Sequence, residues 1–315
     1  MSKRYGHQSL ITIAPEAAYG TVIKQPTEKY SGMWNWDQGY QPVPTNFKTQ
    51  TLEPKVCTQQ AGRIAPTGTM TLDYVEELDT IIKKLIMDAS TAHTIPTSDD
   101  GTVRSFTICR AFPTPGVVND GGDGFRGTGW LPTKLTVTRD GDKIVSTIDW
   151  IGQDGDEEVD FAGSEMVLST ITNTSPPCHT LCFFHALTCS LLDGGTTKLN
   201  NFTLTIEALY NDEDSQFQNG QTRTNPRVIG FNIGLDAEFI YDTTNDALAY
   251  DNIFSQTAKT VVLTITDGTA VHAYTLYGQY VKWNLPDIDR GEYLGNFTFE
   301  ARGDGSNTAL SLAIS

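Results

Sequence analysis

The residue types best suited to bind a metal ion gather in one short stretch of the chain: Cys178, His179, Cys182, His185 and Cys189. A structural zinc site needs four cysteine or histidine ligands in tetrahedral geometry. The spacing here matches none of the common zinc fingers, and leucine, phenylalanine and alanine separate the ligands. This pattern favours buried, reduced thiols over a metal site. We therefore predict no metal and no cofactor, and the one candidate ligand set is Cys178, Cys182, His185 and Cys189.

Acidic loops are the second candidate for ion binding. Asp-Gly sequences recur within residues 119–124, 140–142 and 154–158. A calcium loop needs several oxygen ligands at regular spacing and usually a closing glutamate. None of the three stretches has that spacing, so they predict tight, solvated turns.

Sequence motifs for catalysis are missing. The chain has no G-x-S-x-G, no H-E-x-x-H, no G-x-x-x-x-G-K-[ST] and no G-x-G-x-x-G after a predicted strand. Neighbouring carboxylates such as Glu76-Glu77 point in different directions and form no glycosidase pair. Trp34, Trp36 and Tyr40 offer a stacking platform for sugars or bases, but such residues pack more often into a core or an interface. The sequence therefore predicts no catalytic residues and no enzyme.

The net charge narrows the class of partner. The 315 residues carry a formal net charge of −16, with a pI near 4.6, whereas a protein that grips nucleic acid needs clustered Lys and Arg. An acidic surface is compatible with one past which DNA moves, because like charges repel. No apolar stretch of about 18 residues predicts a membrane span, and the first residues do not predict a signal peptide. The five cysteines then favour reduced thiols in a protein made in a cytosol.

Alternating apolar and polar residues predict that most of the chain is extended. The predicted strands are residues 68–74, 103–110, 199–210, 228–240, 259–266, 280–284 and 293–301, with an extended segment at 47–52 and a hairpin over 134–153 that turns at Asp140-Gly141. Helical spacing appears at residues 75–87 and more weakly at 245–256. The predicted fold class is mainly β, with one helix in each of two parts of the chain.

The order of these elements is similar in two parts of the chain. Each part opens with a strand and a long loop, places one helix between strands, and closes on two strands before a polar Asp-Gly run. We interpret this as an ancient duplication; the alternative is that two unrelated β domains resemble each other. The predicted organisation is an N-terminal arm at 1–45, a first module at 46–165, a linker at 166–190 and a second module at 191–315. In an assembly, the arm and the loops at 54–66 and 211–226 would contact neighbouring subunits.

Five segments are distinctive in their order along the chain. They are Pro15-Glu16-Ala17-Ala18-Tyr19-Gly20-Thr21, residues 68–74 directly before a helix, residues 201–207, Pro226-Arg227-Val228-Ile229-Gly230 and residues 295–301. In this arrangement the chain resembles the duplicated tail tube proteins of long-tailed bacteriophages, from about residue 14 to 303. The first segment is similar to the E-x-x-Y-G-T opening of such subunits. The fourth is similar to their R-P-x-x-I-x-G strand entry, with Pro and Arg exchanged, and residues 178–189 match no pattern of the family.

The resemblance implies two tandem β-sandwich or barrel-like modules with one helix each, whose sheets join around a ring. It also implies a structural virion protein whose stacked rings form the hollow tail tube, the conduit for DNA ejection into the host. A one-module subunit would form a hexameric ring, and a two-module subunit gives the same pseudo-hexameric ring as a trimer, which we favour. The implied partners are further copies of the chain, the tape-measure protein and passing DNA in the lumen, and tail terminator and baseplate proteins at the ends. The implied location is the tail of a virion made in the host bacterial cytoplasm. Two alternatives stay open: another β-rich virion component, such as a head decoration or baseplate protein, and a secreted carbohydrate-binding β-sandwich.

Overall fold

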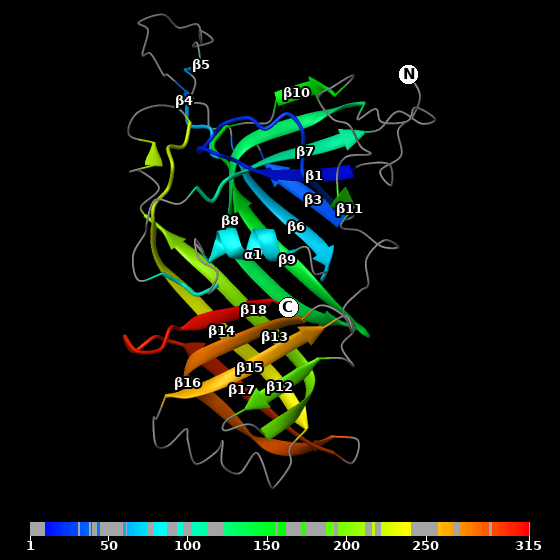
Figure 1. Cartoon of the computed structure of the whole chain (residues 1–315), viewed down its shortest axis with the longest axis vertical. Helices are drawn as coiled ribbons and strands as arrows, with labels where there is room; N and C mark the ends of the chain where they lie inside the picture. The colour runs from blue at the N-terminus through cyan, green and yellow to red at the C-terminus, as the bar shows by residue number, and fades with distance from the viewer. Residues whose placement is uncertain are drawn as a thin grey trace, which may run out of the picture.

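The computed structural model of the chain is mainly β, with one large and almost entirely antiparallel sheet (Figure 1). It describes residues 10–30, 32–37, 39, 43–44, 59–60, 62–74, 78–86, 93–96, 103–112, 122–154, 157–161, 172–173, 187–191, 195–211, 216–217, 222–240, 258–266, 271–289 and 292–314. The strands predicted at 228–240 and 259–266 are confirmed by β14 (Val228–Ile240) and β15 (Lys259–Thr266). The predicted hairpin is confirmed by β8 (Asp123–Asp140) and β9 (Lys143–Ile151).

The first half of the molecule, β1–β10, is two layers that share the long strand β8. One layer has the order β3 (Gly32–Asp37), β6 (Thr67–Asp73), β9 and β8, and the other β2 (Glu28–Tyr30), β1 (Leu10–Pro15), β7 (Phe106–Phe112) and β8. β8 serves both layers because it bends: its first part pairs with β7 and its second part with β9. Gly129 lies at the bend with a φ of 62°, a left-handed conformation that favours glycine.

The second half, β12–β18, closes into a circuit of paired strands. Its strands are β12 (Thr188–Leu191), β13 (Gly195–Tyr210), β14, β15, β16 (Val271–Asp289), β17 (Glu292–Ala301) and β18 (Leu310–Ile314). The pairing runs β13, β14, β17, β16, β15, β12 and returns to β13. β16 passes from β15 to β17 at Gly278, where a Cβ would lie 2.0 Å from the carbonyl oxygen of Glu300. Only glycine allows this close approach.

The order of strand pairing occurs twice. In the first half it is β1, β7, β8, β9, β6, β3, with β10 (Glu157–Asp160) against β8. In the second half it is β12, β15, β16, β17, β14, β13, with β18 against β16. β8 and β16 therefore hold equivalent positions, as do β3 and β13.

The equivalence extends to single residues of the two hairpins. Two residues separate Asp140 from Lys143, and two separate Asp289 from Glu292. Each long strand carries a β-bulge directly before the residue that pairs with the seventh residue of the returning strand: between Pro132 and Lys134 in β8, and between Tyr280 and Lys282 in β16. β16 has a second register shift, between Asn284 and Asp287, that β8 does not have in its pairing with β9. A bulge bends a strand and increases its twist, so both long strands turn into the sheet at the same point.

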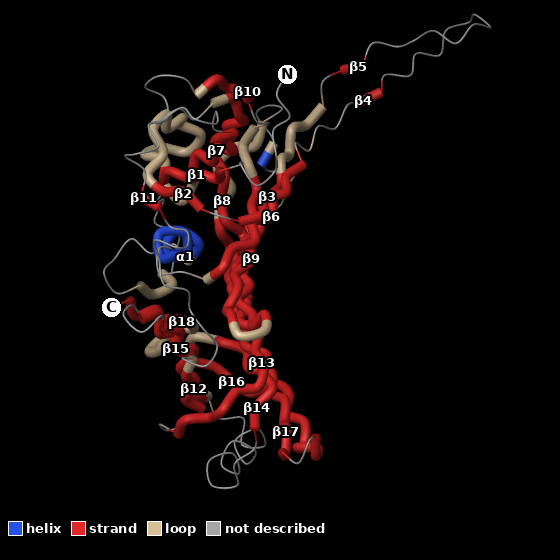
Figure 2. The backbone as a smooth tube through the Cα atoms, turned by 90° about the vertical axis from the view of Figure 1, so that its right-hand side faces the viewer, coloured by secondary structure: helices blue, strands red, loops and turns tan. Residues whose placement is uncertain are grey.

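β13 joins the two halves by pairing with β8. The result is a continuous sheet of eight strands, in the order β3-β6-β9-β8-β13-β14-β17-β16, which we call the long sheet. Figure 2 shows its strands along one side of the molecule, while β1, β7, α1, β12, β15 and β18 form the layer behind it.

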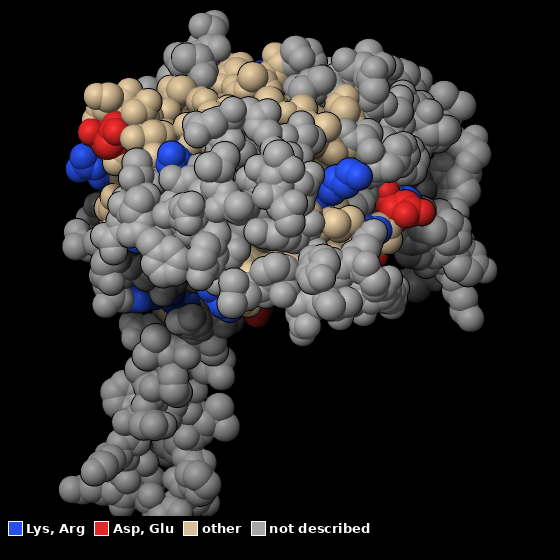
Figure 3. Space-filling model, turned by 90° about the horizontal axis from the view of Figure 1, so that it is seen from below, with Lys and Arg blue, Asp and Glu red and all other residues tan. Residues whose placement is uncertain are grey.

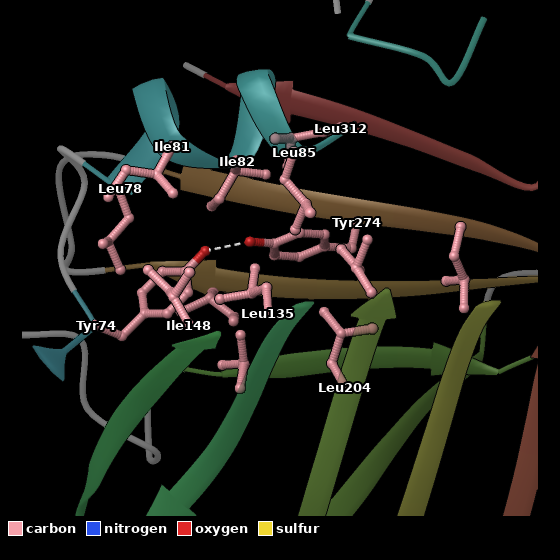
Figure 4. Packing of buried hydrophobic residues seen from close by; sticks show 14 of the residues in the cluster. Tyr74, Leu78, Ile81, Ile82, Leu85, Leu135, Ile148, Leu204, Tyr274 and Leu312 are labelled. Carbon is pink, nitrogen blue, oxygen red and sulfur yellow. Dashed lines mark hydrogen bonds between the residues drawn. The ribbon is translucent and has the colours of Figure 1, made fainter. Parts of the chain in front are cut away.

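The helix α1 (Asp79–Leu85) lies in this second layer, between β1 of the first half and β18 of the second, where the two halves meet (Figure 2). Leu78, Ile81, Ile82 and Leu85 are buried, and Leu85 lies beside Leu312 of β18 (Figure 4). The predicted helix at 75–87 is thus confirmed over its described residues, and its apolar face is the face that is buried. One apolar cluster includes residues of both halves.

A buried polar contact crosses the same junction. The Tyr74 hydroxyl lies 2.5 Å from the Tyr274 hydroxyl and 2.6 Å from Nδ1 of His272, and all three side chains are buried. These bonds satisfy polar atoms that would otherwise cost stability in an apolar core. They also fix how β6 of the first half faces β16 of the second.

The N-terminal segment differs from the arm predicted at residues 1–45. β1 is a buried strand between β2 and β7, and β3 extends the long sheet. Trp34 packs into the core, with its ring centroid 5.2 Å from that of Trp130. The reason is that residues 10–15 carry buried apolar side chains on a strand whose backbone pairs on both edges. The short strands β4 (Val43–Pro44) and β5 (Gln59–Gln60) do lie away from the body (Figure 2).

Other predicted elements lie partly or wholly outside the described residues. These are the extended segment at 47–52, the weaker helix at 245–256 and most of the linker at 166–190. Within the linker range, β11 (Thr172–Asn173) pairs in parallel with β2, and β12 belongs to the circuit of the second half.

Candidate functional site

The face of the long sheet that points away from the second layer is polar in both halves. Alternate residues of each strand point to opposite sides, and those that point inward are buried and mostly apolar. The outward positions include Thr67, Thr69, Thr71, Lys134, Thr136, Thr138, Thr147, Asp149, Asn201, Thr203, Thr205, Glu207, Asn232, Asp236, Glu238, Asn296, Thr298, Glu300, Lys282 and Asn284. We call this surface the polar face.

Cross-strand rows on the polar face continue over the junction between the halves. Thr71 lies opposite Thr147, Thr147 opposite Thr136, and Thr136 opposite Thr205. β-Branched threonines favour the extended backbone and present a hydroxyl to solvent. The surface is therefore continuous across the seam at β8 and β13.

Short polar contacts hold the carboxylates of this face in place. Asp149 accepts a hydrogen bond from Thr69 Oγ1 at 2.9 Å, and Asp236 accepts one from Thr298 Oγ1 at 2.5 Å. Each contact joins neighbouring strands, one in each half. Such cross-strand pairs stabilise a sheet by roughly 0.2–1 kcal/mol each.

Carboxylates outnumber lysines among the described residues of the polar face. The carboxylates are Asp37, Asp73, Asp140, Asp149, Glu207, Asp236, Glu238 and Glu300, and the lysines are Lys134, Lys143, Lys198 and Lys282. Figure 3 shows one end of the molecule, where basic (blue) and acidic (red) side chains lie side by side near two edges of the view. A surface with this balance repels phosphate groups weakly and offers no basic stripe for binding them.

Open hollows lie on the polar face in both halves. One of about 450 Å³ is lined by residues that include Asn35, Asp37, Thr69 and Asp149. Another, of about 400 Å³, is lined by residues that include Asn201, Asp236, Glu238, Lys282 and Asn296. Both are broad and open, unlike the clefts that enclose small ligands. The second has a mainly polar lining, whereas Trp36, Trp150 and Ile151 make the lining of the first mainly apolar.

The long sheet ends at two strands that have a partner on one side only. Among the described residues, β3 pairs with β6 alone, and β16 beyond Gly278 pairs with β17 alone. Met33 on β3 is 60% exposed and Val281 on β16 is 46% exposed. An open sheet edge with exposed apolar side chains is a template for pairing with another chain.

A second polar cluster is structural and lies away from the polar face. The Glu16 carboxylate accepts hydrogen bonds from Gly20 N at 2.8 Å, Ser105 Oγ at 2.6 Å, Thr107 Oγ1 at 3.0 Å and Gly129 N at 2.9 Å. Glu16 is buried and ties the bend of β8 to β7. The first segment of the family resemblance contains this glutamate, and its role here is to hold backbone in place.

Tyr19 of the same segment lies beside a buried arginine of the second half. Burial raises the pKa of Tyr19 well above its ordinary value, and the positive charge of Arg223 opposes that shift. Arg223 Nη1 donates to the Gly152 carbonyl at 3.0 Å, so the loop before β14 is fastened to the first half.

The candidate metal ligands Cys178, Cys182 and His185 lie outside the described residues. Cys189 lies on β12, where burial raises the pKa of its thiol to about 12. A protonated thiol is a poor metal ligand. In the part of the chain that the structure describes, no three His, Cys, Asp or Glu side chains are grouped to hold a metal ion.

The structure does not bring the three aromatic residues Trp34, Trp36 and Tyr40 together as a described stacking platform. Trp34 is a core residue, as the packing prediction required, and Tyr40 lies outside the described residues. Trp36 remains half-buried, with the guanidinium of Arg110 5.0 Å above its ring. The sequence did not predict that the polar sides of these strands form one face. The pattern that indicated it is the threonine at every second position within residues 67–73 and 201–207.

No helix among the described residues is long and apolar enough to cross a membrane. A comparison with protein-family models finds no match for this chain, and a search of curated proteins also finds none.

Proposed function

We propose that the protein is a tail tube subunit of a long-tailed bacteriophage: a non-enzymatic virion protein whose rings stack into a conduit for DNA. The observation that carries the proposal is the long sheet. It has one polar face, two halves with the same pairing order, and two edges without a partner among the described residues. We further propose that the two halves are duplicated tube modules.

The contact between β8 and β13 supplies a model for assembly. It joins the last strand of one half to the first strand of the next, with antiparallel pairing. If β16 of one chain pairs with β3 of another in the same way, the contact is head-to-tail, and head-to-tail contacts close into rings. Closure also removes the exposed edges that otherwise promote aggregation.

The width of such a ring favours three chains. Strands lie about 4.8 Å apart and tilt by about 40° in barrels, so three chains with ~24 strands enclose a backbone circle roughly 50 Å across. That circle leaves room for a DNA duplex inside a lining of side chains. Six chains would give a circle roughly 100 Å across by the same geometry. Three two-module chains would thus form a pseudo-hexameric ring that is wide enough for a DNA duplex.

The polar face would line the lumen of this ring. Its threonines, asparagines and excess carboxylates suit a surface along which DNA slides, because they offer few phosphate contacts and a weak like-charge repulsion. The lumen would also hold the tape-measure protein before ejection. Tail terminator and baseplate proteins would bind the two ends of the stack, in a virion assembled in the bacterial cytoplasm.

Electron microscopy of the purified full chain over a range of concentrations tests the proposal. We expect rings with a central pore, and stacks of them at high concentration. A protein that stays monomeric at every concentration and is missing from purified tails would overturn it. Labelling with gold-conjugated antibody along the tail shaft supports it, whereas labelling confined to the head or the tail tip would favour another virion component.

A further inference from the structure

The junction inside the chain has a defined register. Across it, Thr136 of β8 lies directly opposite Thr205 of β13, and both side chains belong to the polar face. Thr138 lies opposite Thr203, two residues along each strand. If another junction is built from equivalent strands, its register can be derived residue by residue.

The residue of β16 equivalent to Thr136 is Asn284. Thr136 pairs with Thr147, the fifth residue of β9, and Asn284 pairs with Asn296, the fifth residue of β17. Both follow the shared β-bulge by the same distance, since Lys134 and Lys282 stand directly after it. Asn284 is exposed on the polar face.

The residue of β3 equivalent to Thr205 is Asp37. Thr205 pairs with Gly234 of β14, which in turn pairs with Glu300, the ninth residue of β17. Asp37 pairs with Thr67 of β6, which pairs with Ile151, the ninth residue of β9. Asp37 is also exposed on the polar face.

We propose that β16 of one subunit pairs antiparallel with β3 of the next subunit, with Asn284 directly opposite Asp37 of that neighbour. The inference rests on the proposed function, because it takes a second copy of this chain as the occupant of each open edge. It goes further by fixing the register: a slip of one residue would turn the polar face of β3 towards the core side. Lys282 then lies diagonally across from Asp37, within reach of a long side chain.

Cysteine cross-linking of the full chain tests this register. Directly opposed residues have Cα atoms about 4.5–5.5 Å apart, within the range that a disulfide spans. The double variant Asp37→Cys with Asn284→Cys should form disulfide-linked species between chains under mild oxidation, with a covalent trimer as the largest. Unmodified protein and each single variant are oxidised in parallel to measure the background from native cysteines.

The matched control is Asp37→Cys with Asn296→Cys. Asn296 is exposed on the same face but lies one strand further from the edge, opposite Asn284. Adjacent strands are about 4.8 Å apart, so its Cα would lie about 10 Å from that of Asp37, beyond disulfide reach. We expect little cross-linking in this variant.

A charge exchange provides a second readout without cysteine chemistry. Asp37→Lys should weaken assembly in sedimentation experiments, because the new charge lies near Lys282 of the neighbour. Adding Lys282→Glu should restore assembly at least in part. Assembly that is unaffected by Asp37→Lys contradicts the register.

The outcomes separate the two proposals. Rings in the microscope with cross-linking at Asp37 and Asn284 support both. Rings without that cross-link, or with equal cross-linking in the control, overturn the register and leave the tube proposal intact. Unsubstituted protein that stays monomeric at every concentration and is missing from purified tails overturns the tube proposal and the register with it.

Discussion

The long strands β8 and β16 are alike in most respects and differ at one edge. Both pass from the rear layer into the long sheet, both carry a β-bulge before a lysine, and both pair antiparallel with a strand that begins after two intervening residues. The free edge of β8 is covered by β13 of the same chain, whereas the corresponding edge of β16 has no partner among the described residues. The same local structure is therefore completed within the molecule in one half and left open in the other.

The bends of the two strands are stabilised in different ways. At Gly129 in β8 the backbone N–H donates to the buried carboxylate of Glu16. At Gly278 in β16 the bend depends on a close approach to the backbone of β17. The first half uses a charged hydrogen-bond acceptor where the second half uses tight packing. The same order of strand pairing thus does not require the same side-chain contacts.

The largest effect is expected from breaking the internal junction. Thr205→Pro removes a backbone donor from a strand that pairs on both edges, so the free energy of unfolding should fall by about 4 kcal/mol or more. Chemical denaturation followed by circular dichroism measures this. Thr205→Val keeps the β-branched shape and the backbone donor and should change stability little. Equal stability of the two variants would show that the β8–β13 pairing contributes little.

A somewhat smaller loss is expected from the core beneath α1. Ile82 is fully buried where the helix meets both halves, and Ile82→Ala should cost about 2–5 kcal/mol through lost burial and a residual cavity. Lys83→Ala is the control, since it removes only a part-exposed ion pair with Asp79. A single cooperative transition at a lower denaturant concentration would indicate that the halves unfold together, and two transitions would contradict that.

Removing the charge at the bend of β8 should have an intermediate effect. Glu16→Gln places an amide donor among groups that already donate to this position, so we expect a loss of about 1.5–3 kcal/mol. Thermal unfolding measures the loss. Glu158→Gln, at an exposed position of β10, is the matched control. If Glu16→Gln and Glu158→Gln have the same melting temperature, Glu16 does not stabilise the bend.

The smallest effect concerns the reactivity of the Cys189 thiol on β12, the strand that closes the circuit of the second half. Because burial raises the pKa of Cys189 to about 12, its thiol stays protonated from neutral pH to about pH 9 and loses its proton only as the pH rises towards that value. Iodoacetamide at pH 8 should leave Cys189 unmodified in the folded protein and modify it after denaturation, as measured by peptide mass spectrometry. Rapid modification of Cys189 in the folded protein would contradict a closed circuit.

The sequence predicted local structure well where alternation was regular. Residues 228–240 and 259–266 are strands with the predicted bounds, because their side chains alternate without Gly or Pro interruptions long enough to break a strand. Residues 10–15 and 32–37 were assigned to an arm, since short segments with little polar contrast carry weak periodicity. Their strands are specified by partners more than 30 residues away along the chain, such as β7 and β6, and such partners cannot be read from local pattern.

The sequence alone determined that this protein is β-rich and acidic, that an amphipathic helix follows the strand predicted at 68–74, and that a turn lies at Asp140-Gly141. These features depend on side-chain periodicity, charge and turn chemistry, all of which are local. Only the tertiary structure decided that β8 pairs with β13, that the polar sides of eight strands form one face, and that β3 and β16 are its ends. The physical reason is that strand pairing is a long-range choice among many similar backbones, and shared burial of distant side chains selects one arrangement.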